Sequence, residues 1–153
     1  MRTVKSLGED SLIDLLTKGL STGPEILVGP GDDCAVMLGT AKKVRTLFKT
    51  DCIVEGVHFL PDADPAKVGW KAMARAVSDI AAMGGYPVAA LATLVLHPKT
   101  PVAFAEGLYR GFRRAERRFD FAVVGGETSG TNQAGTNMVS VSMLGRVESG
   151  RCT

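Results

Sequence analysis

The stretch KTDCIVEGVHFLPDADPAKVGWKAMARAVSDIAAMGG, residues 49–85, carries the clearest local signals in the chain. Its first part predicts strand, loop and strand, and the first strand is expected to end at Asp51. Asp64 followed by Pro65 predicts a helix start, because Asp caps free backbone N–H groups and Pro fits the first helical position. The helix is expected to reach about Met83, where a glycine pair ends it. The stretch therefore predicts strand structure followed by one long helix.

The flanking segments add further strands and helices. Apolar runs on both sides are typical of strands, and two amphipathic segments are typical of helices. The expected helices cover residues 8–20 and 100–119, and the expected strands cover 34–38, 87–98, 121–128 and 137–147. The strand at 121–128 is expected to be buried and to run into a glycine-rich turn. Strands interspersed with helices predict an α+β or α/β domain, and we expect an α+β fold with a mixed β-sheet flanked by helices.

Composition indicates an ordinary globular domain. The 153 residues suit one domain, with 45% hydrophobic and 22% charged residues, and the net charge of +2 does not indicate a nucleic-acid partner. No apolar run is long enough to cross a membrane. Three cysteines without a C-x-x-C pair do not indicate a disulfide framework or a zinc site, so we expect a reduced, cytoplasmic protein. The strands are long and apolar for so few helices, which predicts that a second copy of the chain covers one sheet face.

Four acidic residues occur where strands or helices are expected to end. Asp32 follows a Gly-Pro-Gly turn, Asp51 ends an expected strand, Asp79 lies in the last turns of the long helix and Glu127 follows a glycine pair. A carboxylate near a helix C-terminus faces the negative end of the helix dipole, which a bound cation would compensate. Oxygen ligands without nearby His or Cys suit Mg²⁺. The alternative is that these acids are turn and cap residues, and spacing alone does not decide between the two.

Three stretches together resemble thiamine-monophosphate kinase: GPGDDCAV (29–36), the stretch at 49–85 and FAVVGGETSG (121–130). Their order and spacing match nearly the whole chain, and EGVHFLPDADP is the most specific part. The resemblance implies a fold like the N-terminal domain of aminoimidazole ribonucleotide synthetase, in a homodimer whose sheets pair into a barrel. It also implies ATP-dependent phosphorylation of thiamine monophosphate to thiamine diphosphate, with several Mg²⁺ ions.

The resemblance assigns individual residues to ligands. Those implied to bind Mg²⁺ are Asp32, Thr50, Asp51, Asp79 and Glu127, with Asp33 as a further candidate. Those implied to contact ATP are Gly125, Gly126 and Glu127. His58 is implied to contact thiamine monophosphate, although its position between two apolar residues is by itself typical of a structural histidine. No residue is assigned as a general acid or base, because a phosphate monoester oxygen is already partly ionised near pH 7.

Two positions differ from the family pattern. Glu127 stands where the family usually has Asp, and Lys49 replaces a small hydroxyl residue before the Thr-Asp pair. A cation at Lys49 would be able to offset metal charge or to reach a phosphate.

The chain is also shorter than members of this family. We expect residues 1–153 to form the N-terminal Mg-ATP-binding and dimerisation domain, with the family's C-terminal domain absent, and to have little kinase activity alone. The alternatives are another synthetase or kinase of the same superfamily and a non-catalytic dimerisation module. A nucleic-acid-binding module is the least favoured. Its only support is a row of arginines at helical spacing, which is more typical of a solvated surface. These are Arg110, Arg113, Arg114 and Arg117.

Overall fold

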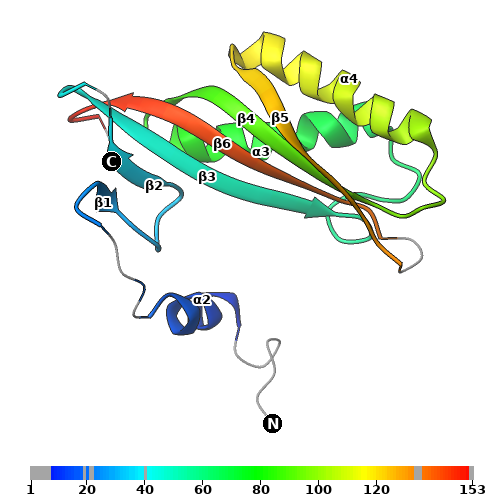
Figure 1. Cartoon of the computed structure of the whole chain (residues 1–153), viewed down its shortest axis with the longest axis horizontal. Coiled ribbons are helices and arrows are strands. Elements are labelled where there is room, and N and C mark those ends of the chain that lie inside the picture. The colour runs from blue at the N-terminus through cyan, green and yellow to red at the C-terminus, as the bar shows by residue number, and fades with distance from the viewer. Residues whose placement is uncertain (1–7, 19, 21–22, 40, 133–135, 152–153) are drawn as a thin grey trace.

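The computed structural model describes residues 8–18, 20, 23–39, 41–132 and 136–151. Its strands form one six-stranded sheet in the order β1-β2-β3-β6-β4-β5 (Figure 1). The strands are β1 (Ile26–Val28), β2 (Ala35–Leu38), β3 (Val44–Val54), β4 (Tyr86–Leu96), β5 (Ala122–Gly130) and β6 (Met138–Glu148). The helices are α2 (Glu9–Thr17), α3 (Pro65–Ala82) and α4 (Val102–Phe119). Only β4 and β5 pair in parallel, so the predicted mixed sheet flanked by helices is confirmed.

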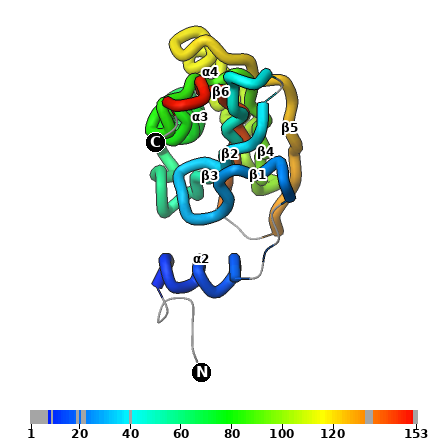
Figure 2. The backbone as a smooth tube through the Cα atoms, turned by 90° about the vertical axis from the view of Figure 1, so that its left-hand side faces the viewer, coloured from blue at the N-terminus to red at the C-terminus, as the bar shows by residue number. Residues whose placement is uncertain are grey.

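The helices α3 and α4 lie side by side on one face of the sheet, while α2 lies apart from this two-layer body (Figure 2). Strand side chains alternate between the two faces, so every second residue points toward the helices. The helix-facing residues of β3, β6 and β4 form the core together with α3 and α4. Its most buried members include Leu47, Ile53, Val139, Val141, Met143, Met73, Ile80, Leu108 and Phe112. No helix of the described residues is long and apolar enough to span a membrane.

Most predicted elements are confirmed, including the start of α3. The Asp64 carboxylate accepts a hydrogen bond from the Ala66 N–H at 2.9 Å, as an N-terminal cap does. The helix ends at Ala82, and Gly84 turns the chain with a φ of 70°, a backbone conformation that glycine adopts without strain. Strand β1 lies outside the predicted elements, since three residues carry too little pattern to be recognised.

Two predicted strand ends are wrong. Strand β3 does not end at Asp51 but continues to Val54, and a tight turn then forms a bridge between Glu55 and Phe59. Strand β5 is not a buried strand that stops at the glycine pair. It runs on through Glu127 to its end as an edge strand, and nearly all of its residues are exposed. Both strands continue because the neighbouring strands supply backbone partners past the polar residues.

The other sheet face has no helix over it in the described part of the chain. Large apolar side chains lie exposed on this open face, among them Phe48, Leu91 and Leu144, each more than two-fifths exposed. Phe48 and Leu144 are direct cross-strand neighbours on β3 and β6. The open face is therefore an exposed apolar surface, on the side of the sheet opposite to α3 and α4.

Candidate active site

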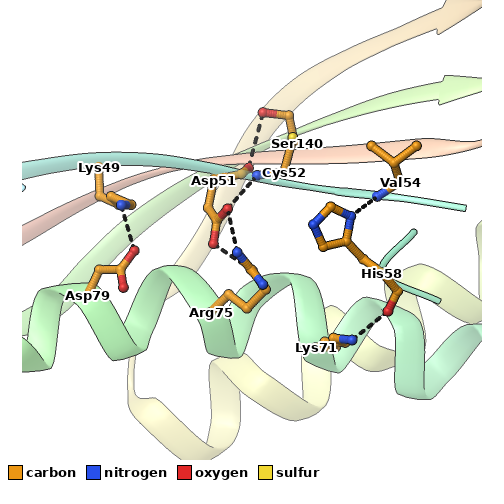
Figure 3. Close-up of polar contacts among 9 residues, drawn as sticks. All are labelled: Lys49, Asp51, Cys52, Val54, His58, Lys71, Arg75, Asp79 and Ser140. Carbon is orange, nitrogen blue, oxygen red and sulfur yellow. Dashed lines mark hydrogen bonds and ion pairs between the residues drawn. The ribbon is translucent and has the colours of Figure 1, made fainter. Parts of the chain in front are cut away.

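Four charged side chains meet between β3 and α3 (Figure 3). Lys49 and Asp51 are two residues apart on β3, so both point toward the helix layer, about 7 Å from each other along the strand. Arg75 and Asp79 are four residues apart on α3, about 6 Å along its axis, and share one helix face. Because the two spacings match, each β3 side chain faces one α3 side chain of opposite charge.

Both opposed pairs are ion pairs. The Arg75 guanidinium binds the Asp51 carboxylate through Nε to Oδ2 at 2.8 Å and through one Nη to Oδ1 at 3.2 Å. The Lys49 Nζ lies 2.7 Å from Asp79 Oδ2. Asp51 Oδ1 also accepts the Cys52 N–H at 2.8 Å. The carboxylates of Asp51 and Asp79 are thus held by cations of the same chain, and the four charges sum to zero.

The electrostatics of this group keep both cations charged. Burial lowers the pKa of Lys49, but the hydrogen bond and charge of Asp79, together with the charge of Asp51, outweigh it and leave that pKa raised. The hydrogen bond from Arg75 to Asp51 and the charge of Asp51 raise the pKa of the arginine further. Lys49 and Arg75 are therefore fully protonated at neutral pH. Each has N–H groups that are able to donate hydrogen bonds to an anionic ligand.

The glycine-rich loop before β2 brings two more acids to the same place. Asp32 and Asp33 are exposed and line a pocket of about 390 Å³ together with Cys34, Lys49 and Thr50. The Asp32 Oδ1 atom accepts the Asp33 N–H at 2.8 Å, which fixes the turn. A second pocket, of about 480 Å³, is lined by Lys49, Asp51, Arg75, Ser78 and Asp79. Lys49 is common to both pockets, so its side chain lies between the Asp32–Asp33 loop and the ion pairs.

Cys34 lines the first of these pockets together with Lys49. The residue is buried, with 2% of its surface exposed. Burial raises the pKa of Cys34 to about 11; the charge of Lys49 lowers it, and the charges of Asp79, Asp33 and Asp32 raise it. The thiol is accordingly neutral at physiological pH and does not add a thiolate ligand to the site.

Thr50 and Glu127 lie on the opposite side of the sheet. Thr50 alternates with Asp51 and points to the open face, where its hydroxyl lies 3.4 Å from that of Ser142. Glu127 of β5 is the cross-strand partner of Thr93 of β4, and both side chains point to the open face. The structure thus brings Asp32, Asp33, Asp51 and Asp79 to the pockets around Lys49. Thr50 lines the pocket of Asp32 and Asp33 but points away from Asp51, and Glu127 lies in neither pocket.

The glycine pair of β5 has a packing role in the described chain. A Cβ atom at Gly126 would overlap the Ala92 carbonyl oxygen of β4, so only glycine fits at this point. A Cβ atom at Gly125 would lie 3.4 Å from the Leu91 side chain. These positions keep β5 close to β4 and leave its backbone exposed at the sheet edge.

His58 lies in the tight turn after β3. Its Nδ1 accepts the Val54 N–H at 3.1 Å, and its carbonyl oxygen accepts a hydrogen bond from the Lys71 ammonium (Figure 3). Because Nδ1 is an acceptor, the neutral ring carries its proton on Nε2. His58 is half-buried, so it combines a structural bond through one ring nitrogen with a donor on the other.

Sequence reasoning missed Arg75 as a member of this group. Its spacing of four residues from Asp79 was the available signal, because residues four apart on a helix lie on one face. The pairing of Arg75 with Asp51 depends on how α3 crosses β3, which no local pattern encodes.

The acids of the site suit Mg²⁺ by chemistry, since all are oxygen donors. Among the described residues, however, no three His, Cys, Asp or Glu side chains are grouped closely enough to hold a metal ion. Mg²⁺ in proteins commonly binds one or two carboxylates and completes its shell with water and substrate phosphates. The site therefore fits a magnesium ion that arrives with phosphate oxygens, and does not fit a bare ion held by protein ligands alone.

With this geometry in hand, comparison with known proteins assigns the chain to a family. The family model of the AIR synthase related protein, N-terminal domain, matches residues 31–147. The chain belongs to this family. The match begins at the glycine-rich loop and ends within β6. It therefore covers α3, α4 and every strand of the sheet except β1.

Curated proteins that are similar to this chain include thiamine-monophosphate kinases. The thiamine-monophosphate kinase of Aquifex aeolicus is 40% identical over 145 residues, covering 95% of this chain and 44% of that protein. The thiamine-monophosphate kinase of Bacillus subtilis is 35% identical over 147 residues, with the same coverage of 95% and 44%. The solved structure of AaThiL complexed with AMPPCP and TMP matches with a TM-score of 0.84 at 39% identity, over 97% of this chain and 44% of that one. The chain thus spans less than half the length of these proteins.

Proposed function

We propose that the chain supplies the N-terminal half of the active site of a kinase that uses ATP to phosphorylate thiamine monophosphate to thiamine diphosphate. The observation that carries this proposal is the similarity to thiamine-monophosphate kinases along 95% of the chain, at up to 40% identity. AaThiL, whose solved structure has a very similar fold, was crystallised with AMPPCP, an ATP analogue, and with TMP. In this proposal, residues 1–153 are the Mg-ATP-binding and dimerisation domain, and ligands from outside the described chain complete the site.

The pockets around Lys49 would receive the phosphates of ATP. Asp32, Asp51 and Asp79 would hold Mg²⁺ together with the nucleotide, with Asp33 as a further ligand. Bound Mg²⁺ would bridge phosphate oxygens and neutralise the negative charge that develops on them. Lys49 and Arg75 would orient the phosphates through N–H donors, which are already in place as donors to Asp79 and Asp51.

The acceptor chemistry suits a site without a strong base. The attacking atom is a phosphate oxygen, which is partly ionised near pH 7 because the second pKa of a phosphate monoester is about 6. Two anionic groups must meet in line, so positioning and charge neutralisation supply most of the catalysis. His58 would contact thiamine monophosphate through its Nε2 proton, while its Nδ1 keeps the turn in place.

The open face would be the surface through which two copies associate. Phe48, Leu91 and Leu144 expose apolar area that pairing of two sheets into a barrel would bury. Thr50 already lines the pocket of Asp32 and Asp33 and would be a metal ligand there. Gly125, Gly126 and Glu127 would join the nucleotide site as ATP and metal ligands only in such a larger assembly, since they lie on the edge strand β5, outside both pockets. The free thiols of Cys34 and Cys52 suit a reducing compartment, and we place the protein in the cytoplasm.

Calorimetric titration of the chain with Mg-AMPPCP tests the nucleotide part of this proposal. We expect weak, saturable binding that falls about tenfold or more in Asp51→Asn and in Asp79→Asn, because each loses a charge-assisted contact. Asp62→Asn, which removes one exposed carboxylate from the loop before α3, is the matched control and should bind like wild type. Equal affinity in all four proteins would contradict the assignment of Asp51 and Asp79.

Turnover tests the kinase part. With ATP, Mg²⁺ and thiamine monophosphate, we expect little ADP and little thiamine diphosphate from the chain alone, since it spans less than half of the similar kinases. A rate like that of a full-length kinase would overturn the proposal that the chain holds half of the site. Binding of Mg-AMPPCP with no competition or enhancement by thiamine monophosphate would favour another kinase or synthetase of the same family.

A further inference from the structure

Lys49 occupies the position where the acids of the site converge. Its side chain lines both pockets, with Asp32 and Asp33 on one side and Asp51 and Asp79 on the other. The Nζ atom lies 2.7 Å from Asp79 Oδ2, and both side chains are about three-quarters buried, with 23% and 26% of their surface exposed. An ammonium group therefore already neutralises the carboxylate that a divalent cation would need.

The two cations of the site differ in how firmly they are held. The planar guanidinium of Arg75 donates two hydrogen bonds to the Asp51 carboxylate, and this two-point contact fixes the orientation of the arginine side chain. Lys49 makes one ion pair with Asp79 from the end of a flexible four-carbon stem. Of the two cations, Lys49 is therefore the one that is able to leave its partner, the Asp79 carboxylate, by breaking a single contact.

We propose that Lys49 is an internal counter-ion that occupies the Asp79 carboxylate until a nucleotide arrives, so that this chain takes up Mg²⁺ only together with a phosphate ligand. The proposal rests on the proposed function for the choice of ligand, a nucleotide polyphosphate. In the exchange, the ammonium of Lys49 leaves Asp79 Oδ2 and pairs with a phosphate oxygen, and the vacated carboxylate becomes a metal ligand. No proton is transferred and no covalent bond changes.

The charges of the site explain why the metal and the nucleotide must bind together. A bare Mg²⁺ ion would bring two positive charges beside Lys49 and Arg75, whose charges are already balanced by Asp79 and Asp51. A nucleotide polyphosphate brings the negative charge that both Mg²⁺ and the displaced ammonium require. Its phosphates also supply further oxygen ligands, since no three metal-binding side chains of the described residues are grouped closely enough to hold the ion.

The test measures binding of Mg²⁺ by calorimetry at constant ionic strength, with choline chloride as the balancing salt. We expect Mg²⁺ alone to bind the wild type too weakly to saturate, and to bind Lys49→Met at least about tenfold more tightly than the wild-type limit, because the competing charge is removed. Lys67→Met removes an exposed ammonium from α3, away from both pockets, and is the matched control. It should behave like the wild type. Equal Mg²⁺ affinity in wild type and Lys49→Met would overturn the proposal.

Melting temperature and paramagnetic broadening test the role of Lys49 independently of calorimetry. Lys49→Gln removes the charge but keeps a hydrogen-bond donor toward Asp79, and its melting temperature should rise with MgCl₂ while that of wild type stays constant. In the wild type, Mn²⁺ used as a paramagnetic probe should broaden resonances near Asp79 only when AMPPCP is present. Broadening by Mn²⁺ alone at the same concentration would contradict the inference.

The inference and the proposed function fail in different ways. If wild type does not bind Mg-AMPPCP at all, the proposed function fails, while the effect of Lys49→Met on Mg²⁺ alone still decides the role of Lys49. If wild type binds Mg-AMPPCP but Lys49→Met gains no affinity for Mg²⁺ alone, the inference fails and the proposed function stands.

Discussion

Gly111 of α4 lies directly against the backbone of Gly69 of α3: a Cβ atom at Gly111 would fall 2.9 Å from the Gly69 carbonyl carbon. It would also fall 2.6 Å from the Trp70 backbone nitrogen. These atoms belong to helix backbone, so they are unable to move aside as a flexible side chain would. The two helices therefore pack in close contact, and this contact sets where α3 holds Arg75 and Asp79 above the sheet.

We expect Gly111→Ala to lower the free energy of unfolding by about 1–3 kcal/mol, the usual cost of overpacking a tight interface, despite the better helix propensity of alanine. Urea unfolding followed by circular dichroism measures the change. Gly23→Ala is the matched control, because a Cβ atom at Gly23 meets no atom within 4 Å, and it should leave the stability unchanged or slightly raised. A Gly111→Ala protein as stable as wild type would show that α3 and α4 are free to move apart.

His58→Asn is expected to separate the two roles of this residue. The Asn Oδ1 atom takes nearly the position of the His Nδ1 atom, so it should still accept the Val54 N–H, and stability should stay close to wild type. His58→Ala loses that bond and should lose about 1 kcal/mol in urea unfolding. Both variants lose the Nε2 proton and should bind thiamine monophosphate more weakly. Normal binding of this substrate to His58→Asn would leave the histidine with a structural role only.

Cys34 should make stability depend on pH in the alkaline range. The folded protein keeps the thiol proton until a pKa of about 11, whereas an ordinary thiol releases it at 9.0. The folded state therefore binds more protons in this window. Its extra stability is complete below pH 9 and is lost as the pH rises to about 11, by about 2–3 kcal/mol.

Other groups titrate in the same range, so the measurement is the difference between wild type and Cys34→Ala. Urea unfolding at pH 8 and pH 11 should show a steeper loss for wild type. Parallel pH profiles would mean that Cys34 does not titrate with a raised pKa. As a second check, a Cys52→Ser, Cys152→Ser double variant should react with a thiol reagent only after unfolding, because Cys34 is buried.

If two copies associate through the open face, a charge introduced at an apolar residue of β3 should weaken the dimer. Phe48→Lys puts an ammonium beside Leu144 in the centre of this face and should shift a dimer to a monomer in analytical ultracentrifugation. Val102→Lys is the matched control, since Val102 is an exposed apolar residue at the start of α4, in the helix layer. Its sedimentation should equal that of wild type. A Phe48→Lys protein that sediments as wild type does would place the contact between copies elsewhere.

The sequence predicted the elements with strong local signals. The Asp64–Pro65 pair marks the start of α3, and the alternating apolar residues of 137–147 mark β6, because capping and side-chain alternation are local properties. The sequence predicted that Asp51 ends its strand. Asp51 does not interrupt β3, since Arg75 neutralises it from the helix layer. That partner is fixed by tertiary packing and is invisible to local pattern.

The sequence did not show which of the assigned residues lie close together, for a similar reason. Asp32 and Asp79 are distant in sequence, yet both lie beside Lys49. Thr50 and Asp51 are adjacent in sequence, yet they lie on opposite faces of the sheet. A correct strand boundary would have shown this, because neighbouring residues of a strand always point to opposite sides.

The place of β6 in the sheet has a consequence for how the protein folds. β6 is the last of the described strands along the chain, but it lies between β3 and β4 and pairs with both along nearly its whole length. Before β6 is synthesised, β1-β2-β3 and β4-β5 form two separate groups of strands, each with an unpaired edge. Pairing across such long sequence separations is slow, and unpaired edges invite aggregation. The two groups of strands are thus joined only when β6 is present, and we expect the nascent chain to be most prone to misassembly before residues 138–148 leave the ribosome.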